Sequence, residues 1–193
     1  LHDVGKVAIS DTILKKPGRF NAEERTIMET HTWHGARLFT DRQSEFDEIA
    51  QQVALNHHEN WDGTGYPGHI DIMTGEPTTK DANGKAVGKK GKEIHIFGRI
   101  VAIADVYDAL RSNRVYKSAW KEEDTLREIR KLSGTRFDPE LIDDFFAVLP
   151  NLQAVSDKFA EGPAELSRDA DAKDPDKDNL TPAPNASERA SEE

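Results

Sequence analysis

The spacing of hydrophobic positions predicts a chain made mostly of helices. Over residues 122–132 and 45–58, apolar residues recur every three or four positions, the period at which one face of a helix is buried, and residues 22–30 follow a helix-start pattern. No convincing pair of strands and no internal repeat appears in the sequence, so the predicted fold class is all-α. In the second segment the predicted buried face consists of Phe46, Ile49, Ala50, Val53, Ala54 and His57.

Helix ends are marked by residues that favour them. Asn21 followed by Glu24 is typical of a capping box at a helix start. Asp138 and Pro139 predict the start of a last helix. Residues 94–110 are almost continuously apolar without alternation, which predicts a buried helix. The side chains that the last helix is expected to turn inward are Leu141, Ile142, Phe145 and Phe146.

Two segments depart from this pattern. Residues 68–93 are rich in glycine and lysine, and so long a loop inside a compact domain is either functional or mobile. Two interpretations of this segment remain: a mobile surface insertion, or a lid over the substrate whose lysines approach a phosphate ligand. Residues 156–193 carry 11 acidic and 5 basic residues and several prolines. Such a composition buries too little apolar surface to offset chain entropy, so we expect a disordered acidic tail after a domain spanning 1–155.

The composition excludes several classes of protein. The chain has no cysteine, which rules out a disulfide framework, a thiolate zinc site and a cysteine nucleophile. A net charge of −10 argues against bulk nucleic acid as a partner, because a phosphate backbone favours a basic surface. No apolar run approaches the roughly 20 residues that cross a bilayer, and no secretion leader is visible. The expected location is cytoplasmic.

Histidines and one carboxylate predict a metal site. His57 and His58 are adjacent, and His57 ends the apolar face of its helix. Asp105 lies inside the apolar segment 94–110, where a carboxylate is costly unless a cation meets it. An arginine would supply that cation, and a metal would do so equally well, since neutral imidazole is the commonest metal ligand. Histidine and carboxylate donors without thiolate suit Mn, Fe, Ni or Zn.

Several motifs, in order, resemble one enzyme family. Residues 2–6 (HDVGK) resemble the HD signature of metal-dependent phosphohydrolases. Residues 56–67 (NHHENWDGTGYP) resemble the HH…DGxGYP signature of its HD-GYP subclass. Residues 99–110, 114–117 and 133–139 resemble segments that follow in that family. One motif alone is a weak signal, but this series at these spacings is highly specific.

The resemblance implies an all-helical HD domain that binds two divalent metal ions, or three in some members, with Fe or Mn expected. The implied metal ligands are His2, Asp3, His31, His57, His58 and Asp105. Lys6 matches a lysine near the scissile phosphate and, with Asp3, forms the implied catalytic pair. The implied substrate-binding residues are Lys6, Asp62, Gly63, Gly65, Tyr66, Pro67, Asp108, Arg114 and Lys117. His34, His69 and His95 are expected to be bystanders.

The implied activity is hydrolysis of cyclic di-GMP to linear pGpG, and in some members to GMP. The implied mechanism is attack on phosphorus by a metal-bound hydroxide, with Asp3 bridging two ions. An HD phosphohydrolase of another nucleotide and a non-catalytic domain that binds a cyclic dinucleotide or a protein are the alternatives. The chain starts at Leu1 without the upstream helices of the family. We therefore expect an upstream sensory or receiver domain, and a homodimer is a further expectation.

Overall fold

The computed structural model describes residues 1–41, 43–112 and 120–160, with side chains up to Leu152. Within these residues isolated β-bridges occur but no strand, which confirms the all-α fold class. In chain order the helices are η1 (Val4–Ala8), α1 (Asp11–Leu14), α2 (Ala22–Glu29), α3 (His31–Arg37), α4 (Glu45–Asn56), η2 (Gly91–Glu93), α5 (Ile96–Arg111), α6 (Glu122–Lys131) and α7 (Pro139–Ala160).

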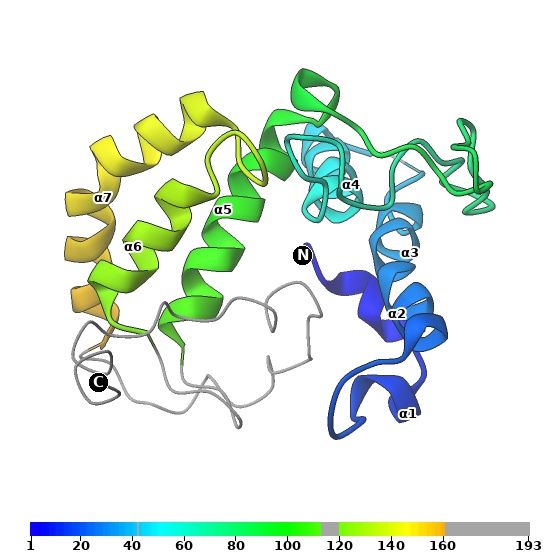
Figure 1. Cartoon of the computed structure of the whole chain (residues 1–193), viewed down its shortest axis with the longest axis horizontal. Coiled ribbons are helices and arrows are strands. Elements are labelled where there is room, and N and C mark those ends of the chain that lie inside the picture. Colours follow the sequence, from blue (N-terminus) through cyan, green and yellow to red (C-terminus); the bar gives the residue numbers. More distant parts are fainter. Residues whose placement is uncertain (42, 113–119, 161–193) are drawn as a thin grey trace, which may run out of the picture.

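The helices form two groups that meet where α4 packs against α5. On one side α5, α6 and α7 lie next to one another, and on the other side α1, α2 and α3 follow in sequence (Figure 1). The main contacts between elements join α3 to α4 and to η1, and α4 to α5. The first residues of the chain therefore reach the middle of the molecule, between the two groups (Figure 1).

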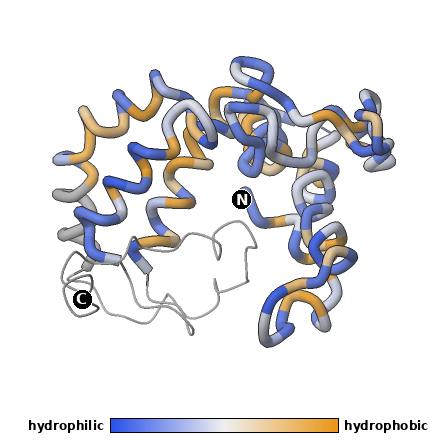
Figure 2. The backbone as a smooth tube through the Cα atoms, in the orientation of Figure 1, coloured by the Kyte–Doolittle hydropathy of each residue, from blue (hydrophilic) through white to orange (hydrophobic). Residues whose placement is uncertain are grey.

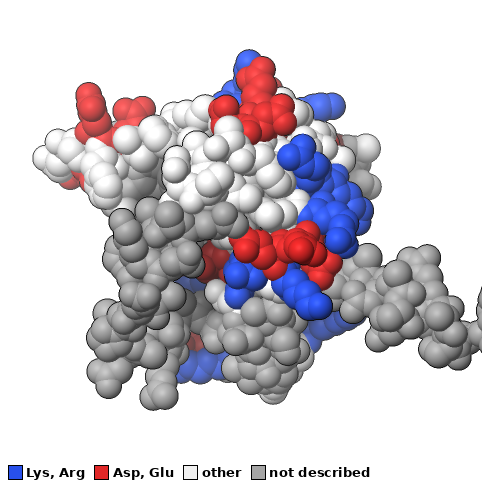
Figure 3. Space-filling view, turned by 90° about the vertical axis from the view of Figure 1, so that its left-hand side faces the viewer, with Lys and Arg blue, Asp and Glu red and all other residues white. Residues whose placement is uncertain are grey.

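Each group has its own apolar core. Val106, Ile129, Phe137 and Ile142 are buried between α5, α6 and α7, whereas Met28 is buried with Ile9 and Ile13 on the other side. Figure 2 shows apolar and polar positions interspersed along α5, α6 and α7, as expected for amphipathic helices with one buried face. The outer face of this group carries acidic side chains next to lysines and arginines (Figure 3).

The predicted helix ends agree with the structure in most places. Asn21 and Glu24 form both hydrogen bonds of the capping box, each of 2.8 Å, at the start of α2. α4 begins at Glu45 but ends at Asn56, so that His57 caps the helix and His58 lies beyond it. The expected buried face of α4 was wrong at Phe46, which is 62% exposed. The helices packed against α4 are α3 and α5; Ala50 and Ala54 are buried, whereas Glu45 and Phe46 in its first turn are exposed.

The prediction that the apolar segment 94–110 is buried is only partly correct. α5 is a helix, but Ile96, Phe97 and Ile100 are exposed by 41%, 38% and 43%. The buried residues of α5 are Gly98, Ala102, Ile103, Val106 and Leu110, and the helices packed against it are α4, α6 and α7, whereas the apolar residues near its start stay exposed.

The loop and the tail differ in how much of them the structure describes. Residues 68–93 form two short turns with the isolated bridges Ile70–Pro77 and Lys80–Ala86, and end in η2. Backbone hydrogen bonds join parts of this loop to one another, such as Val87 to Thr79, and the backbone N–H of Gly91 donates to the carbonyl of Trp61 outside it. α7 extends to Ala160, past the predicted boundary at 155, and the remaining tail, 161–193, lies outside the described residues. None of the described helices is both long enough and apolar enough to cross a membrane.

Candidate functional site

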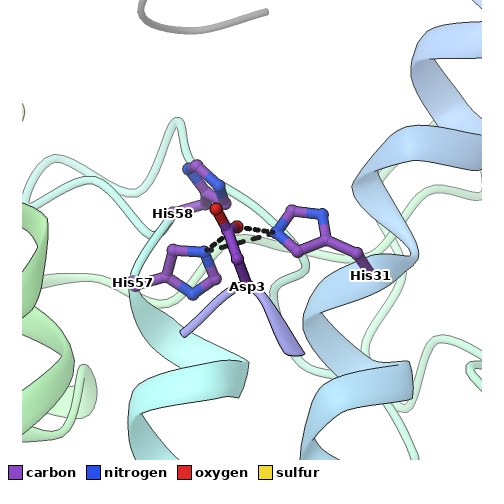
Figure 4. Close-up of side chains that lie close together, drawn as sticks. All are labelled: Asp3, His31, His57 and His58. Atoms are coloured by element: carbon purple, nitrogen blue, oxygen red, sulfur yellow. Dashed lines mark hydrogen bonds and ion pairs between the residues drawn. The ribbon is translucent and has the colours of Figure 1, made fainter. Parts of the chain in front are cut away.

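Four of the six predicted metal ligands lie together at the junction of η1, α3 and α4. Asp3 precedes η1, His31 is the first residue of α3, and His57 and His58 follow the last residue of α4. One donor atom from each side chain lies within 4.8 Å of every other. Figure 4 shows the Asp3 carboxylate pointing at the imidazole rings of His31 and His57, with His58 beside them.

Backbone carbonyls fix the tautomers of two of these histidines. His31 Nδ1 lies 2.7 Å from the carbonyl oxygen of Met28, and His57 Nδ1 lies 3.0 Å from that of Ala54. A carbonyl only accepts, so in each neutral ring Nδ1 carries the proton and Nε2 presents its lone pair. Burial, together with the nearby His57 ring, lowers the pKa of His31 to about 4, so this ring is neutral at pH 7.

The Nε2 lone pairs of His31 and His57 face a buried carboxylate oxygen of Asp3. His31 Nε2 lies 3.3 Å from His57 Nε2, and these atoms lie 3.5 and 3.8 Å from Asp3 Oδ1 (Figure 4). Asp3 Oδ1 is buried and has no hydrogen-bond partner. Lone pairs and a carboxylate oxygen repel one another unless a cation lies between them. Nitrogen and oxygen donors in this arrangement therefore fit a divalent metal.

The other two predicted ligands, His2 and Asp105, meet beside this cluster. His2 Nε2 lies 3.3 Å from Asp3 Oδ2 and 3.5 Å from Asp105 Oδ1. Burial opposes protonation of His2, but its hydrogen bonds to Asp105 and Asp3 outweigh it and raise its pKa to about 9. Burial also opposes ionisation of Asp3, yet the hydrogen bond from the His2 imidazole and the ammonium of Lys6 hold its pKa well below the usual range.

An arginine was the alternative to a metal beside Asp105, and two of the three arginines near it in sequence, Arg99 and Arg111, make other contacts. Arg99 pairs with Asp138 at the start of α7, and Arg111 donates to the carbonyl of Trp120. Arg114 lies outside the described residues. The structure places the imidazole of His2 against Asp105.

Lys6 lies at the edge of the cluster. It is on η1, one turn after Asp3, and its Nζ donates to Asp3 Oδ2 at 2.8 Å. Only 9% of the residue is exposed. Asp3 therefore uses its two oxygens differently: Oδ2 faces Lys6 and His2, whereas Oδ1 faces His31 and His57.

The Gly-Tyr-Pro loop contacts the cluster through one aromatic ring. The Tyr66 ring stacks on His58 with 4.7 Å between centroids, and its backbone N–H donates to the carbonyl of His58. Gly65 lies so close to the chain that a Cβ there would be 2.2 Å from the backbone nitrogen of Asn60. Together with Pro67 these residues line an open pocket of about 390 Å³ against α2 and α3. The described lining of that pocket contains none of the six predicted ligands.

The remaining predicted substrate residues are dispersed. Asp62 accepts hydrogen bonds from the backbone and hydroxyl of Thr64, a turn that Gly63 continues with a φ of +86°. Asp108 is exposed on α5. Arg114 and Lys117 lie outside the described residues.

Sequence reasoning missed three residues that surround the histidine pair. Asn56 and Glu59 flank His57 and His58 and are 1% and 2% exposed. Lys89, from the long loop, contacts both of them. Burial raises the pKa of the Glu59 carboxyl to about 6. The signal available in the sequence was the position of Asn56 and Glu59 next to the two histidines, because polar residues there must share the burial of the site.

The histidines expected to be bystanders lie away from the cluster. His34 stacks on Trp33, His69 lies 3.8 Å from Glu93, and His95 caps the start of α5.

Comparison with known proteins agrees with this fold. The HD domain family matches residues 1–110, and the chain belongs to that family. It is 41% identical over 145 residues to a cyclic di-GMP phosphodiesterase of Thermotoga maritima, covering 75% of this chain and 34% of that protein. It is 39% identical over 166 residues to a cyclic di-GMP phosphodiesterase of Vibrio cholerae, covering 83% and 30%.

A third relative bears on the substrate. It is a 3'3'-cGAMP-specific phosphodiesterase 2 of Vibrio cholerae, 38% identical over 159 residues, with 79% of this chain and 27% of that protein covered. The chain thus spans about a third of the length of these relatives.

Proposed function

We propose that this chain is the hydrolase domain of a metal-dependent phosphodiesterase that opens cyclic di-GMP to linear pGpG, with GMP as the product of a second round. The observation that carries the proposal is the convergence of His31, His57 and the unpartnered oxygen of Asp3. Relatives of the same HD family that are named as cyclic di-GMP phosphodiesterases support it.

The six side chains suit a centre of two ions, Fe or Mn, with three ions as the alternative stoichiometry. His2, Asp3, His31, His57, His58 and Asp105 would hold them. When bound, the ions would lower the pKa of a coordinated water and stabilise charge on the phosphoryl oxygens. Asp3 suits a bridging position, since Oδ1 faces His31 and His57 whereas Oδ2 faces His2 and Lys6.

The protein's own residues would bind the phosphodiester and stabilise its charge. Lys6 would turn its ammonium from Asp3 to a phosphoryl oxygen, whose negative charge grows in the transition state. Arg114 and Lys117 would hold the distal phosphate, the first as a two-pronged donor and the second as a point charge. The residues proposed to line the rest of the substrate site are Asp62, Gly63, Gly65, Tyr66, Pro67 and Asp108.

The test is a product assay with the metal content measured in parallel. The chain is loaded with Fe²⁺ or Mn²⁺ and incubated with cyclic di-GMP, and with GTP as a competing phosphate ester. We expect pGpG as the first product and about two metal ions per chain by elemental analysis. Hydrolysis of GTP alone would favour a phosphohydrolase of another nucleotide. Binding of cyclic di-GMP by a metal-loaded chain without turnover would favour the non-catalytic alternative.

The second candidate substrate is 3'3'-cGAMP, because one relative at similar identity is specific for it. The two cyclic dinucleotides differ in one base, so the comparison of kcat/KM for cyclic di-GMP and 3'3'-cGAMP decides between them. We propose cyclic di-GMP as the better substrate.

We also propose how this domain fits into a larger protein. The matched segments make up 27–34% of the three relatives, which supports an enzyme in which a further domain accompanies the HD domain. We propose that this domain is a sensory or receiver domain and that the enzyme is a cytoplasmic signalling protein. Residues beyond the last helix would form an acidic tail, and self-association to a homodimer is a further proposal.

A further inference from the structure

Lys89 contacts the residues on both sides of the histidine pair. Its Nζ donates to Asn56 Oδ1 at 2.7 Å, and its backbone N–H donates to Glu59 Oε2 at 3.2 Å. Asn56 is the residue before His57, and Glu59 is the residue after His58. One residue of the long loop, 30 positions further along the chain, therefore holds the two-histidine segment at its beginning and at its end.

Asn56 is fixed by contacts in addition to that with Lys89. Its side-chain amide donates to the carbonyl of Gln52 at 2.7 Å, one turn earlier in α4. On another side it packs against Gly98 of α5, where an added Cβ would lie 2.6 Å from the Asn56 Cβ. These contacts orient Oδ1 toward the loop, and this buried acceptor is matched by the ammonium of Lys89.

Glu59 ties the same loop to the chain after the histidines. Its Oε1 accepts the backbone N–H of Gly68 at 2.6 Å, where the loop starts, and its Oε2 accepts that of Lys89, where the loop returns. The negative charge of Glu59 and the positive charge of Lys89 offset each other. The arrangement therefore adds no net charge beside a centre that would hold cations.

Close backbone packing fixes the position of Lys89 itself. A Cβ at Gly88 would lie 2.2 Å from the carbonyl oxygen of Gly63, and one at Gly68 would lie 2.4 Å from that of Val87. The backbone N–H of Gly91 donates to the carbonyl of Trp61 at 2.9 Å. On both sides of Lys89 the loop packs closely against the segment from Trp61 to Gly68. The side chain of Lys89 therefore extends inward from a fixed backbone.

We propose that Lys89 is a positioning residue for the metal centre, which sets the direction of the His57 and His58 side chains. The proposal rests on the metal centre inferred above. The backbone N–H of His57 makes the last hydrogen bond of α4, to the carbonyl of Val53, and His58 lies beyond the helix, so the helix alone does not fix this segment. Anchors at Asn56 and Glu59 supply what the helix does not. Such outer partners orient metal-binding histidines and strengthen metal affinity.

The experiment measures Co²⁺ binding by visible absorption for the wild-type chain and three variants. Lys89→Met keeps the length of the side chain but removes the ammonium, and we expect Co²⁺ affinity to fall by about 10–100-fold with altered absorption bands. Lys80→Met removes the same charge from an exposed position in the same loop and should leave affinity and spectrum unchanged. Lys89→Arg, whose guanidinium still donates to Asn56, should recover most of the affinity.

The outcomes separate this proposal from the proposed function. If the wild-type chain binds Co²⁺ and Lys89→Met binds it with the same affinity and spectrum, Lys89 does not position the histidines and the proposal is overturned, while the metal centre stands. If the wild-type chain binds no Co²⁺, the metal centre fails and this proposal fails with it. Melting in EDTA shows whether Lys89→Met folds. If it does not, Lys89→Gln, too short to reach Asn56, replaces it with the same expectations.

Discussion

His2 Nε2 lies 3.5 Å from Asp105 Oδ1, a contact that joins the second residue of the chain to the middle of α5. The same nitrogen lies 3.3 Å from Asp3 Oδ2. Asp105 therefore reaches the cluster of Asp3, His31, His57 and His58 through His2, although about 100 residues separate the two in sequence.

Asp105→Asn should remove metal. The amide keeps the volume of the side chain but loses the negative charge that stabilises nearby cations. We expect metal content to fall by at least about half and hydrolysis of cyclic di-GMP to be lost. Elemental analysis checks this, with Asp143→Asn on the exposed side of α7 as the control. Full metal and full activity in Asp105→Asn would instead assign this carboxylate to the ion pair with His2.

Lys6→Ala should separate metal binding from hydrolysis. An ammonium is not a metal ligand, but it stabilises the charge that develops on a phosphoryl oxygen. Metal content should stay intact while turnover falls by about 10²–10³, the effect of losing one oxyanion donor. Lys15→Ala is the matched control, because Lys15 also pairs with an aspartate, Asp11, in an exposed position. Joint loss of metal and turnover would show that Lys6 supports Asp3 instead.

The stability of the metal-free protein should fall as the pH rises from about 6.5 to about 9. Burial opposes protonation of His2, but its bonds to Asp105 and Asp3 raise its pKa to about 9. Between these two values the folded chain binds the proton more tightly than the unfolded chain, so unfolding becomes easier with each step in pH. Urea unfolding in EDTA measures the slope, and in His2→Gln that slope should be nearly absent.

Gly88→Ala should destabilise the protein more than Gly84→Ala. At Gly88 the added Cβ would lie 2.2 Å from the Gly63 carbonyl, a backbone atom that no rotamer change can move. We expect a loss of about 3 kcal/mol or more in unfolding free energy. Gly84 has open space but a φ of +79°, so alanine there should cost about 1–2 kcal/mol. Equal losses of unfolding free energy in the two variants, measured with urea, would show that the backbone at Gly88 shifts to accommodate the added Cβ.

Removal of residues 161–193 should leave the melting temperature and the turnover nearly unchanged. We propose this segment as an acidic tail, because its composition offers too few apolar residues to form a core. The cut follows α7, which ends at Ala160. Melting curves of the full and shortened chains test this proposal, and a clear drop after shortening would contradict it.

Local chemistry made much of the fold predictable. Asn21 and Glu24 satisfy each other's backbone groups whatever surrounds them, so the start of α2 could be inferred from two residues. Phe46 was misjudged because helical spacing identifies an apolar face but not how far a neighbouring helix covers it. Ile96 and Ile100 were misjudged for the same reason, because an apolar residue in a helix stays exposed where no neighbouring helix covers it.

The candidate site, too, could be predicted only in part from the sequence. The adjacent histidines and a carboxylate in an apolar helix indicated metal chemistry, and Asp3, His31, His57 and His58 do converge. The role of Lys89 could not be inferred, because its contacts depend on how a long loop folds back on residues 56–68. A lysine in a segment rich in lysines gives no sign in the sequence that it points inward.

The tight return of the long loop also suggests where a probe could be attached. The turn from Asp81 to Lys85 is exposed, and nothing lies within 4 Å of a Cβ at Gly84. Exposed turns of this kind tolerate inserted residues. A fluorescent label at Asn83 would sit on a short arm whose other end, Lys89, touches both flanks of the histidine pair. If metal binding shifts the contacts of Lys89, such a label would report metal loading without any substrate.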